Sequence, residues 1–252
     1  MSTTFHARNA HAYQQFMGRW SRRLARKFIA FAGLADGERI LDVGCGTGSL
    51  TFALAEAANL AKIVAIDASE IYLAAARANN KDPRISFERA DACALPFKPH
   101  TFDLIVSIST LDHLPPAALP DALGELCRVL RPAGCLILTL DSRHNPLHVL
   151  SNHIRRWMRR IHAERCYTVN EVVAALARQP VAVTETTAIY HVPFPVNFLA
   201  KKARAAAGAR ADVWIRGVVG LCRRLAALPT RFFTGRYIAL RIVKETDSTA
   251  GR

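Results

Sequence analysis

The stretch LDVGCGTG at residues 41–48 constrains the fold of this chain more than any other. It follows a short apolar run at residues 39–41 and precedes a helical pattern of apolar residues at 50–57. Glycines tolerate positive φ and let a ligand approach the backbone closely. The N–H groups that open the next helix then face whatever lies above the turn. The sequence therefore predicts a strand, a tight glycine turn and a helix that together bind a ligand.

The spacing of the glycines separates two kinds of ligand. A dinucleotide-binding turn has the pattern G-x-G-x-x-G, whereas here the pattern is G-x-G-x-G, with Asp42 two residues before the first glycine. This arrangement resembles the nucleotide loop of the class I S-adenosylmethionine (SAM)-dependent methyltransferases. SAM has a zwitterionic methionine end in place of a phosphate, and the resemblance implies that Asp42 accepts from its ammonium group.

Two further acids follow predicted strands. Asp67 ends an apolar run at 63–67 and can accept from ribose hydroxyls, which fits NAD as well as SAM. Its alternative role is the N-cap of a helix at 69–78. Asp91 comes just after a strand at 85–88 and resembles the methyltransferase acid that accepts from the adenine amino group. Because of this third acid, we rank SAM above NAD as the predicted cofactor.

The order of elements predicts an α/β fold. Strands are expected at 39–43, 63–67, 85–88, 102–107, 135–140, 181–190 and 237–243, and helices at 48–58, 69–78, 117–130, 151–165 and 167–178. Alternating strands and helices form right-handed βαβ units. Over about residues 39–141 the chain resembles the small-molecule branch of the family, which includes quinone- and lipid-modifying enzymes. The resemblance implies a Rossmann-like, doubly wound, seven-stranded, mostly parallel sheet with helices on both faces.

The chain divides into four predicted parts. These are an N-terminal helical lid at 1–38, the SAM-binding core at 39–192, a basic helical insertion at 193–235 and the last strand with a tail at 236–252. The N-terminal segment is either a helix packed on the core with a solvated basic face or a lid that brings Tyr13, Trp20 and Arg19 to the cofactor. The resembling family joins its last two strands by a short hairpin, so the insertion departs from its minimal fold.

The resemblance also assigns site residues. The cofactor-binding set, for SAM and its product S-adenosylhomocysteine, is Asp42, Gly44, Cys45, Gly46, Gly48, Asp67, Ala68, Asp91, Ala92, Ser107, Tyr13 and Arg19. A general base is needed only if the acceptor arrives protonated. His113, just after the fourth strand, is our first candidate for that base, although it could equally be a packing or helix-start histidine. His144 and Tyr167 are weaker candidates.

The positive charge is concentrated in one part of the sequence. The chain has a net charge of +14, and residues 143–241 contain 17 Lys/Arg against 4 Asp/Glu. Apolar stripes flanked by arginines are typical of helices that lie on anionic membranes. The same arginines could contact a phosphate backbone, or they could be solvated while the stripes pack on the core. We rank a membrane or amphiphile first, a solvated surface second and nucleic acid third.

Several motifs are missing. The six cysteines form no C-x-x-C pair, so we expect no metal site. Residues 107–110 lack the Asn/Asp-Pro-Pro-aromatic motif of amino methyltransferases that act on DNA bases. With no signal-peptide core and no 18-residue apolar run, we expect a cytoplasmic protein, peripheral to the inner face of the membrane if the basic part binds lipid.

We therefore predict a SAM-dependent methyltransferase for a small or lipid-like, amphiphilic and anionic acceptor. The alternatives are an RNA methyltransferase and a non-catalytic binding or regulatory protein with the same fold. The acceptor atom and the oligomeric state stay open.

Overall fold

The computed structural model describes residues 28–157, 165–189, 213, 217, 220, 224 and 231–246. Its helices and strands, with η marking 3-10 turns, are β1 (Arg39–Val43), α2 (Ser49–Ala57), β2 (Lys62–Asp67), α3 (Glu70–Asn79), β3 (Ile85–Arg89), β4 (Phe102–Ile108), η1 (Leu111–His113), η2 (Pro116–Ala118), α4 (Leu119–Val129), β5 (Leu130–Asp141), α5 (Pro146–Trp157), α6 (Val169–Leu176), β6 (Val181–Ile189), α9 (Arg231–Thr234) and β7 (Tyr237–Lys244).

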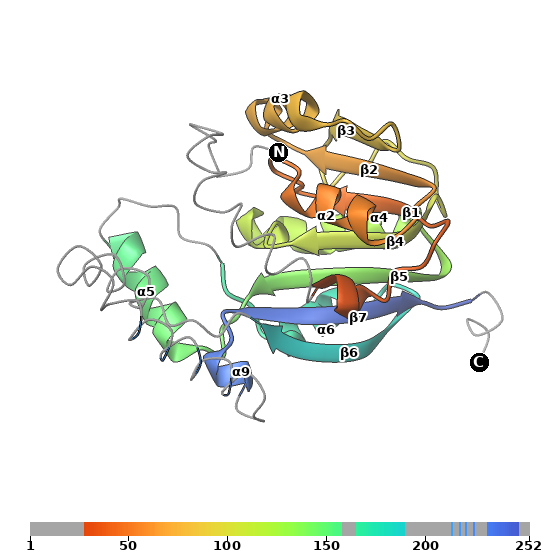
Figure 1. Ribbon diagram of the computed structural model, residues 1–252. Helices are drawn as coiled ribbons and strands as arrows, with labels where there is room; N and C mark the ends of the chain where they lie inside the picture. Colours follow the sequence, from red (N-terminus) through yellow and green to blue (C-terminus); the bar gives the residue numbers. More distant parts are fainter. Residues whose placement is uncertain are drawn as a thin grey trace.

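These strands form one sheet, which confirms the predicted Rossmann-like α/β fold (Figure 1). The strand order is β3-β2-β1-β4-β5-β7-β6. The first five strands in this order are parallel, and β7 runs antiparallel to both β5 and β6. The order reverses between β1 and β4. Open α/β sheets bind ligands at such a switch point, outside the carboxyl ends of the strands.

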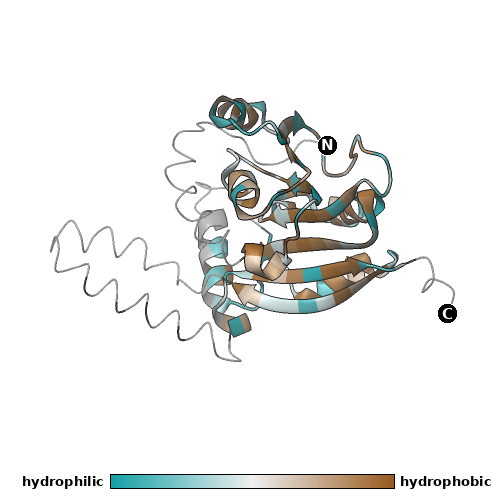
Figure 2. Cartoon of the chain, turned by 45° about the vertical axis from the view of Figure 1, so that its right-hand side comes forward, coloured by the Kyte–Doolittle hydropathy of each residue, from teal (hydrophilic) through white to brown (hydrophobic). Residues whose placement is uncertain are grey.

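Apolar side chains bury the sheet on both faces. One core cluster joins the sheet to α4 and α6, and the other joins it to α2, α3 and the helical turn at residues 28–32. The central strands are hydrophobic along most of their length (Figure 2), as expected for parallel strands covered on both faces. The sheet is thus rigid where its carboxyl edge presents polar residues.

Two predicted boundaries differ from the structure by five residues each. β5 begins at Leu130 rather than at residue 135, because Leu130 already pairs with Phe102 before an irregularity in the ladder. α5 begins at Pro146 rather than at residue 151. Proline suits the first turn of a helix, and Asn145 Oδ1 accepts from the backbone N–H of His148 at 3.1 Å. Sequence periodicity did not reveal this cap.

Side chains cap the N-terminal ends of α3 and α6. Ser69, and not Asp67, is the N-cap of α3, and its hydroxyl accepts from the backbone N–H of Tyr72. Thr168 caps α6 in a reciprocal capping box with Glu171. Asp67 is therefore available for another role.

Several predictions fall on other parts of the chain. Tyr13, Trp20, Arg19 and most of the predicted insertion lie outside the described residues, so the lid and the domain boundaries stay predictions. Phe28 and Ala32, at the described end of the N-terminal segment, are buried against the sheet. Among the described residues, no helix is long and apolar enough to cross a bilayer.

A buried lysine joins the last strand to α4. Lys244 is 8% exposed, and its Nζ donates to the carbonyls of Cys127 at 2.6 Å and Leu130 at 2.8 Å. The carbonyls at the end of a helix have no intrahelical partner, and a cation there also interacts favourably with the helix dipole. Lys244 thus satisfies the end of α4 from a strand that is distant in sequence.

We expect the Lys244→Met substitution to lower the free energy of unfolding by about 2–4 kcal/mol, because two buried carbonyls lose their donor. Urea denaturation measures this difference. The control is Lys62→Met, since Lys62 is exposed at the start of β2, and its effect should stay within about 0.5 kcal/mol. Equal effects of the two substitutions would contradict the role of Lys244.

Candidate cofactor site

The glycine turn after β1 is fastened to the end of β2. The backbone N–H groups of Gly44 and Cys45 donate to the carbonyl of Ile66 at 2.8 and 3.0 Å. The next N–H, of Gly46, donates to Asp67 Oδ2 at 2.9 Å. The turn therefore runs across the end of β2 and fixes the Asp67 carboxylate.

Two glycines in this turn are required by their surroundings. Gly44 has φ of +76°, and a Cβ there would lie 2.1 Å from Thr110 Oγ1, which itself donates to the carbonyl of Val43 at 3.1 Å. Gly48 has φ of +82°, and a Cβ there would lie 2.8 Å from the ring of Phe52. The turn after β4 thus packs directly on the turn after β1.

The start of α2 offers backbone donors. Its N-cap is Gly48, and no side chain caps it. The first N–H groups of a helix lack intrahelical partners and attract anionic groups. This uncapped helix start above a close-packed glycine turn fits the carboxylate of a methionine moiety, so the residues present suit SAM.

Asp67 is held on both of its oxygens. Besides Gly46, the backbone N–H of Ser69 donates to Asp67 Oδ1 at 2.8 Å. Burial raises the pKa of this carboxyl, and the backbone hydrogen bonds oppose that rise. Each carboxylate oxygen can accept more than one hydrogen bond. Asp67 is therefore oriented and can still accept from a ligand hydroxyl.

Asp42 is the most deeply buried acid of the site. It is 1% exposed, and Thr51 Oγ1 donates to its Oδ2 at 2.6 Å. Burial raises the pKa of Asp42 to about 7, the Thr51 hydrogen bond lowers it and the Asp67 charge raises it further. A cation bound nearby would favour the ionised form. Asp42 thus lies near the end of β1, and its side chain contacts α2 through Thr51.

Asp91 follows β3 in the position expected from the sequence. Its Oδ1 accepts from the backbone N–H of Cys93 at 2.9 Å, and it forms a bridge with Ala94. Because β1, β2 and β3 are neighbouring parallel strands, Asp42, Asp67 and Asp91 all lie toward one edge of the sheet. Ala68 is exposed and Ala92 partly buried beside the second and third of these acids.

Cys45 lies inside the turn and is 8% exposed. Burial, with the charges of Asp42 and Asp67, raises the pKa of its thiol far above the usual range. The thiolate is the nucleophilic form, so the position of Cys45 favours a packing role.

The end of β4 supplies the other half of the site. Ser107 is wholly buried, and its hydroxyl has no hydrogen-bond partner among the described residues. Ser109 has φ of +47° and is held by Thr139, whose backbone carbonyl and hydroxyl both accept from its N–H. A non-glycine residue in this conformation is strained, and such strain is common at functional sites.

The candidate bases lie at the carboxyl ends of β4 and β5. His113 ends η1 and is partly buried. Tyr167 is 3% exposed, bridges to Ser142 after β5, and its hydroxyl has no hydrogen-bond partner among the described residues. His144 is partly exposed in the loop after β5. These three residues therefore lie beyond the strand ends, on the β4–β5 side of the sheet.

Sequence reasoning missed Thr51 and Thr110, which fix Asp42 and the glycine turn. Thr51 lies three residues after Gly48, on the face of α2 that turns toward the sheet, and this spacing is a signal that could have identified it. Thr110 contacts Gly44 across 66 residues of sequence, and no local pattern indicates such a contact.

The raised pKa of Asp42 predicts a pH dependence of stability. The folded state keeps this proton up to about pH 7, whereas the unfolded chain loses it near pH 4, so the free energy of unfolding falls as pH rises between these values. In the ligand-free protein Asp42→Asn, which keeps an acceptor for Thr51, should become increasingly more stable than wild type over this range. The gain should level off above about pH 7, at no more than roughly 4 kcal/mol.

Urea denaturation at several pH values, without ligand, measures this difference. A gain that does not change between pH 5 and pH 8 would contradict the assigned pKa of Asp42.

Part of the chain is similar to known methyltransferases. Residues 40–134 match the family model described as a methyltransferase domain. Demethylmenaquinone methyltransferase from Symbiobacterium thermophilum is 36% identical over 140 residues, which cover 52% of this chain and 54% of that protein. Trans-aconitate 2-methyltransferase from Methylobacterium nodulans is 34% identical over 161 residues, covering 64% and 58% of the two chains. The chain thus spans little more than half the length of these relatives.

A solved structure supports the fold over a larger part of the chain. Phosphoethanolamine N-methyltransferase 2 from Haemonchus contortus, in complex with SAM, superposes with a TM-score of 0.65 at 15% identity. The superposition covers 95% of this chain and 61% of that one. Residues 40–134 thus match a methyltransferase domain, and the glycine turn and the strand order agree with the Rossmann-like fold of the SAM-bound structure.

Proposed function

We propose that this protein transfers a methyl group from SAM to a small, amphiphilic acceptor. The observation that carries the proposal is the hydrogen bond between the glycine turn and Asp67. It brings backbone donors and an oriented carboxylate together at one edge of the sheet. The family match supports the reaction class. The names of the two relatives, a quinone-precursor methyltransferase and a trans-aconitate methyltransferase, support a small acceptor.

Each part of the cofactor has a proposed partner. The start of α2 and the glycine turn would hold the methionine carboxylate, and Asp42 would balance its ammonium group. Asp67 would accept from the ribose hydroxyls and Asp91 from the adenine amino group. In this proposal Cys45, Ala68, Ala92 and Ser107 line the same edge, and Tyr13 and Arg19 would cover the site from the N-terminal segment.

The acceptor would lie at the ends of β4 and β5. SAM supplies an activated methyl group on a sulfonium, and the protein must hold the acceptor atom in line with it. Tyr167 offers a buried hydroxyl on this side. If the acceptor is protonated, His113 would remove the proton.

Asp67→Ala tests the cofactor site. Loss of charge-assisted hydrogen bonds worth about 1.5–3 kcal/mol should weaken SAM binding 10-fold or more. Isothermal titration calorimetry measures the dissociation constant. The matched control is Asp121→Ala, because Asp121 is exposed in the first turn of α4 and should leave SAM affinity unchanged. Unchanged affinity in a folded Asp67→Ala protein would remove the ribose assignment.

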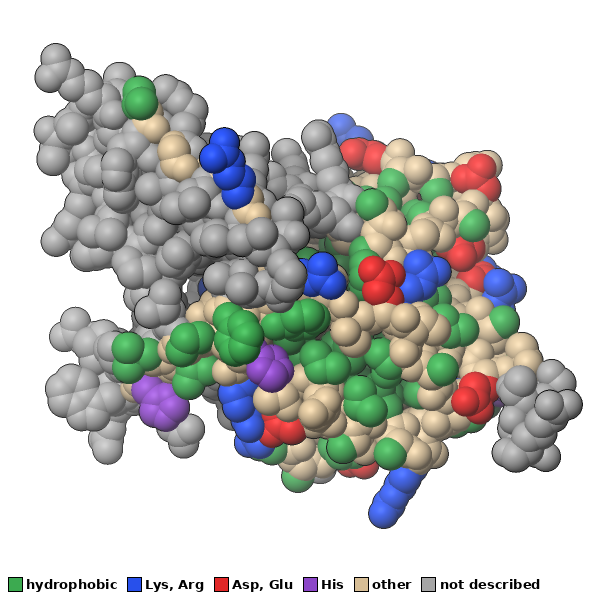
Figure 3. Space-filling model, turned by 90° about the horizontal axis from the view of Figure 1, so that it is seen from below, with side chains coloured by type: hydrophobic (Ala, Val, Ile, Leu, Met, Phe, Trp, Pro, Cys, Tyr) green, Lys and Arg blue, Asp and Glu red, His purple; other side chains and the backbone are tan. Residues whose placement is uncertain are grey.

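The basic part of the chain supports an amphiphilic acceptor. Residues 143–241 contain 17 Lys/Arg and 4 Asp/Glu. Leu150 on α5 is 57% exposed and Phe233 on α9 is 64% exposed. Asn145, just before α5, donates through Nδ2 to the carbonyl of Gly235, just after α9, at 3.3 Å. Figure 3 shows hydrophobic side chains gathered on one part of the molecular surface. Apolar and cationic side chains together favour an anionic lipid surface.

Labelled SAM and a whole-cell extract test the acceptor class. After incubation, lipid, RNA, protein and small-molecule fractions are separated and counted. We expect label in the organic phase, and binding of the protein to anionic vesicles that salt releases. Label in RNA would replace the proposal with an RNA methyltransferase. SAM binding without label in any fraction would favour the alternative of a binding or regulatory protein.

A further inference from the structure

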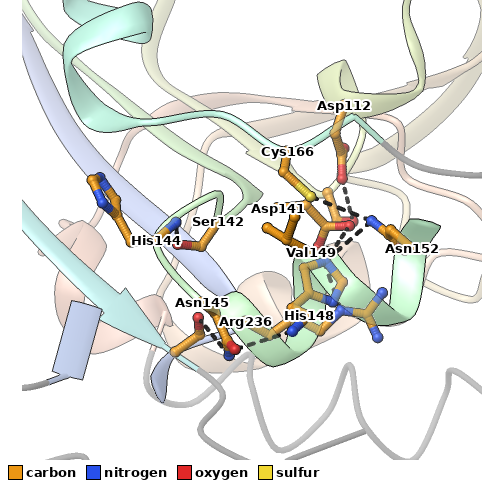
Figure 4. A network of polar contacts seen from close by, with 12 residues as sticks. Asp112, Asp141, Ser142, His144, Asn145, His148, Val149, Asn152, Cys166 and Arg236 are labelled. Carbon is orange, nitrogen blue, oxygen red and sulfur yellow. Dashed lines mark hydrogen bonds and ion pairs between the residues drawn. The ribbon is translucent and has the colours of Figure 1, made fainter. Parts of the chain in front are cut away.

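A second polar cluster lies at the carboxyl end of β5. It consists of Asp141 from the end of β5, His148 from α5 and Cys166 from the segment before α6. Their carboxylate oxygen, imidazole nitrogen and thiol sulfur all lie within 4.8 Å of one another. Figure 4 shows these side chains pointing toward one another from three separate elements. The cofactor site described above uses none of them.

Asp141 and His148 are buried, and Cys166 is half-buried. Asp141 is 0% and His148 5% exposed. His148 Nε2 lies 3.1 Å from Asp141 Oδ2, and Arg236 Nε lies 3.4 Å from the other oxygen, Oδ1. Asn152 Nδ2 donates to Cys166 Sγ at 3.3 Å. Three groups that commonly ligate metals therefore converge where water has little access.

We propose that Asp141, His148 and Cys166 bind a zinc-type divalent cation. A thiolate, an imidazole and a carboxylate form a donor set that suits Zn²⁺, and soft sulfur excludes Mg²⁺ and Ca²⁺ as preferred ions. The carboxylate and the thiolate together carry two negative charges, which balance the charge of the ion. The thiol of Cys166 would lose its proton when it binds the ion, because the thiolate is the form that ligates metals.

The surroundings match those of metal ligands. A ligating carboxylate is commonly held on its second oxygen by a neighbouring donor, and Arg236 has this position on Asp141. The Asn152 amide supports the negative charge of the sulfur in the same way. From usual bond lengths, ligands around tetrahedral zinc lie roughly 3.3–3.6 Å apart. Since the donors lie within 4.8 Å of one another, none would have to close by more than about 1.5 Å around the ion, and the pair His148 Nε2–Asp141 Oδ2, at 3.1 Å, would open slightly.

The position of the cluster indicates its role. The backbone N–H of Tyr167 donates to the carbonyl of Asp141 at 2.8 Å, and that of Arg143 donates to the carbonyl of Tyr167 at 2.9 Å. The segment before α6 thus already lies against the end of β5. A metal ion would link α5 to the end of β5 and to the segment before α6. It would thereby fix the relative positions of these three segments at the carboxyl end of β5. Figure 4 shows Asp112, from η1, at the border of the same cluster.

No spacing rule reveals these ligands, because they are separated by 6 and 17 residues and none belongs to a C-x-x-C pair. The proposal therefore revises the expectation of no metal that the cysteine pattern gave. It does not depend on the proposed methyl transfer.

Cobalt is the probe, since Co²⁺ occupies zinc sites and reports thiolate ligation by absorbance. The full chain is treated with a chelator, dialysed and titrated with Co²⁺, and Zn²⁺ is then added as competitor. We expect a sulfur-to-cobalt charge-transfer band with one Co²⁺ per chain, displaced by Zn²⁺. Cys166→Ser should abolish the band, and His148→Gln should weaken binding at least 100-fold. The control is Cys93→Ser, a partly buried cysteine outside the cluster, which should keep the band.

Thermal unfolding gives a second measurement that does not require the variants. Binding to the folded state raises the melting temperature in proportion to the logarithm of ligand concentration, so Zn²⁺ should stabilise the wild-type chain and a chelator should reverse the effect. SAM affinity is measured in parallel and reports the cofactor site separately. Absence of a cobalt band and of Zn²⁺ stabilisation in wild type would overturn the proposal, as would a band that survives in both Cys166→Ser and His148→Gln.

Discussion

The hydrogen bond from the Gly46 N–H to Asp67 is the contact on which the cofactor site depends. It joins the turn after β1 to the end of β2 and, with the two bonds to Ile66, sets where α2 begins. Thr110 closes the turn from the other side and leaves no room for a side chain at Gly44. The turn is thus fixed by its neighbours in the sheet, and the ligand meets a surface that is already ordered.

The same arrangement makes the ionised form of Asp42 unfavourable in the ligand-free protein. Asp42 is buried beside Asp67 without a cation among its hydrogen-bond partners, and its pKa is raised accordingly. Burial of this carboxylate lowers the free energy of unfolding of the ligand-free protein. A bound ligand with a cationic group would raise it again. Binding energy and folding energy are therefore coupled through a side chain that is 1% exposed.

The sequence predicted the sheet well, because buried parallel strands are continuous apolar runs bounded by polar residues. The ends of β1, β2 and β3, and with them Asp42, Asp67 and Asp91, followed from these runs. The starts of β5 and α5 did not, since an irregular ladder at Phe102 and a cap by Asn145 depend on tertiary contacts. For the same reason, neither Thr110 nor the grouping of His148 with Asp141 could be inferred from local patterns.

The antiparallel course of β7 has a consequence for the way this fold can vary. Ile189, the last residue of β6, and Asp141, the last of β5, both pair with Tyr237, the first residue of β7. The connection between β6 and β7 therefore leaves and re-enters the sheet at the edge where the parallel strands end. Chain can be lengthened or exchanged there without disturbing the strands that carry the glycine turn, so evolution can vary the segment between β6 and β7 while the geometry of the turn stays the same.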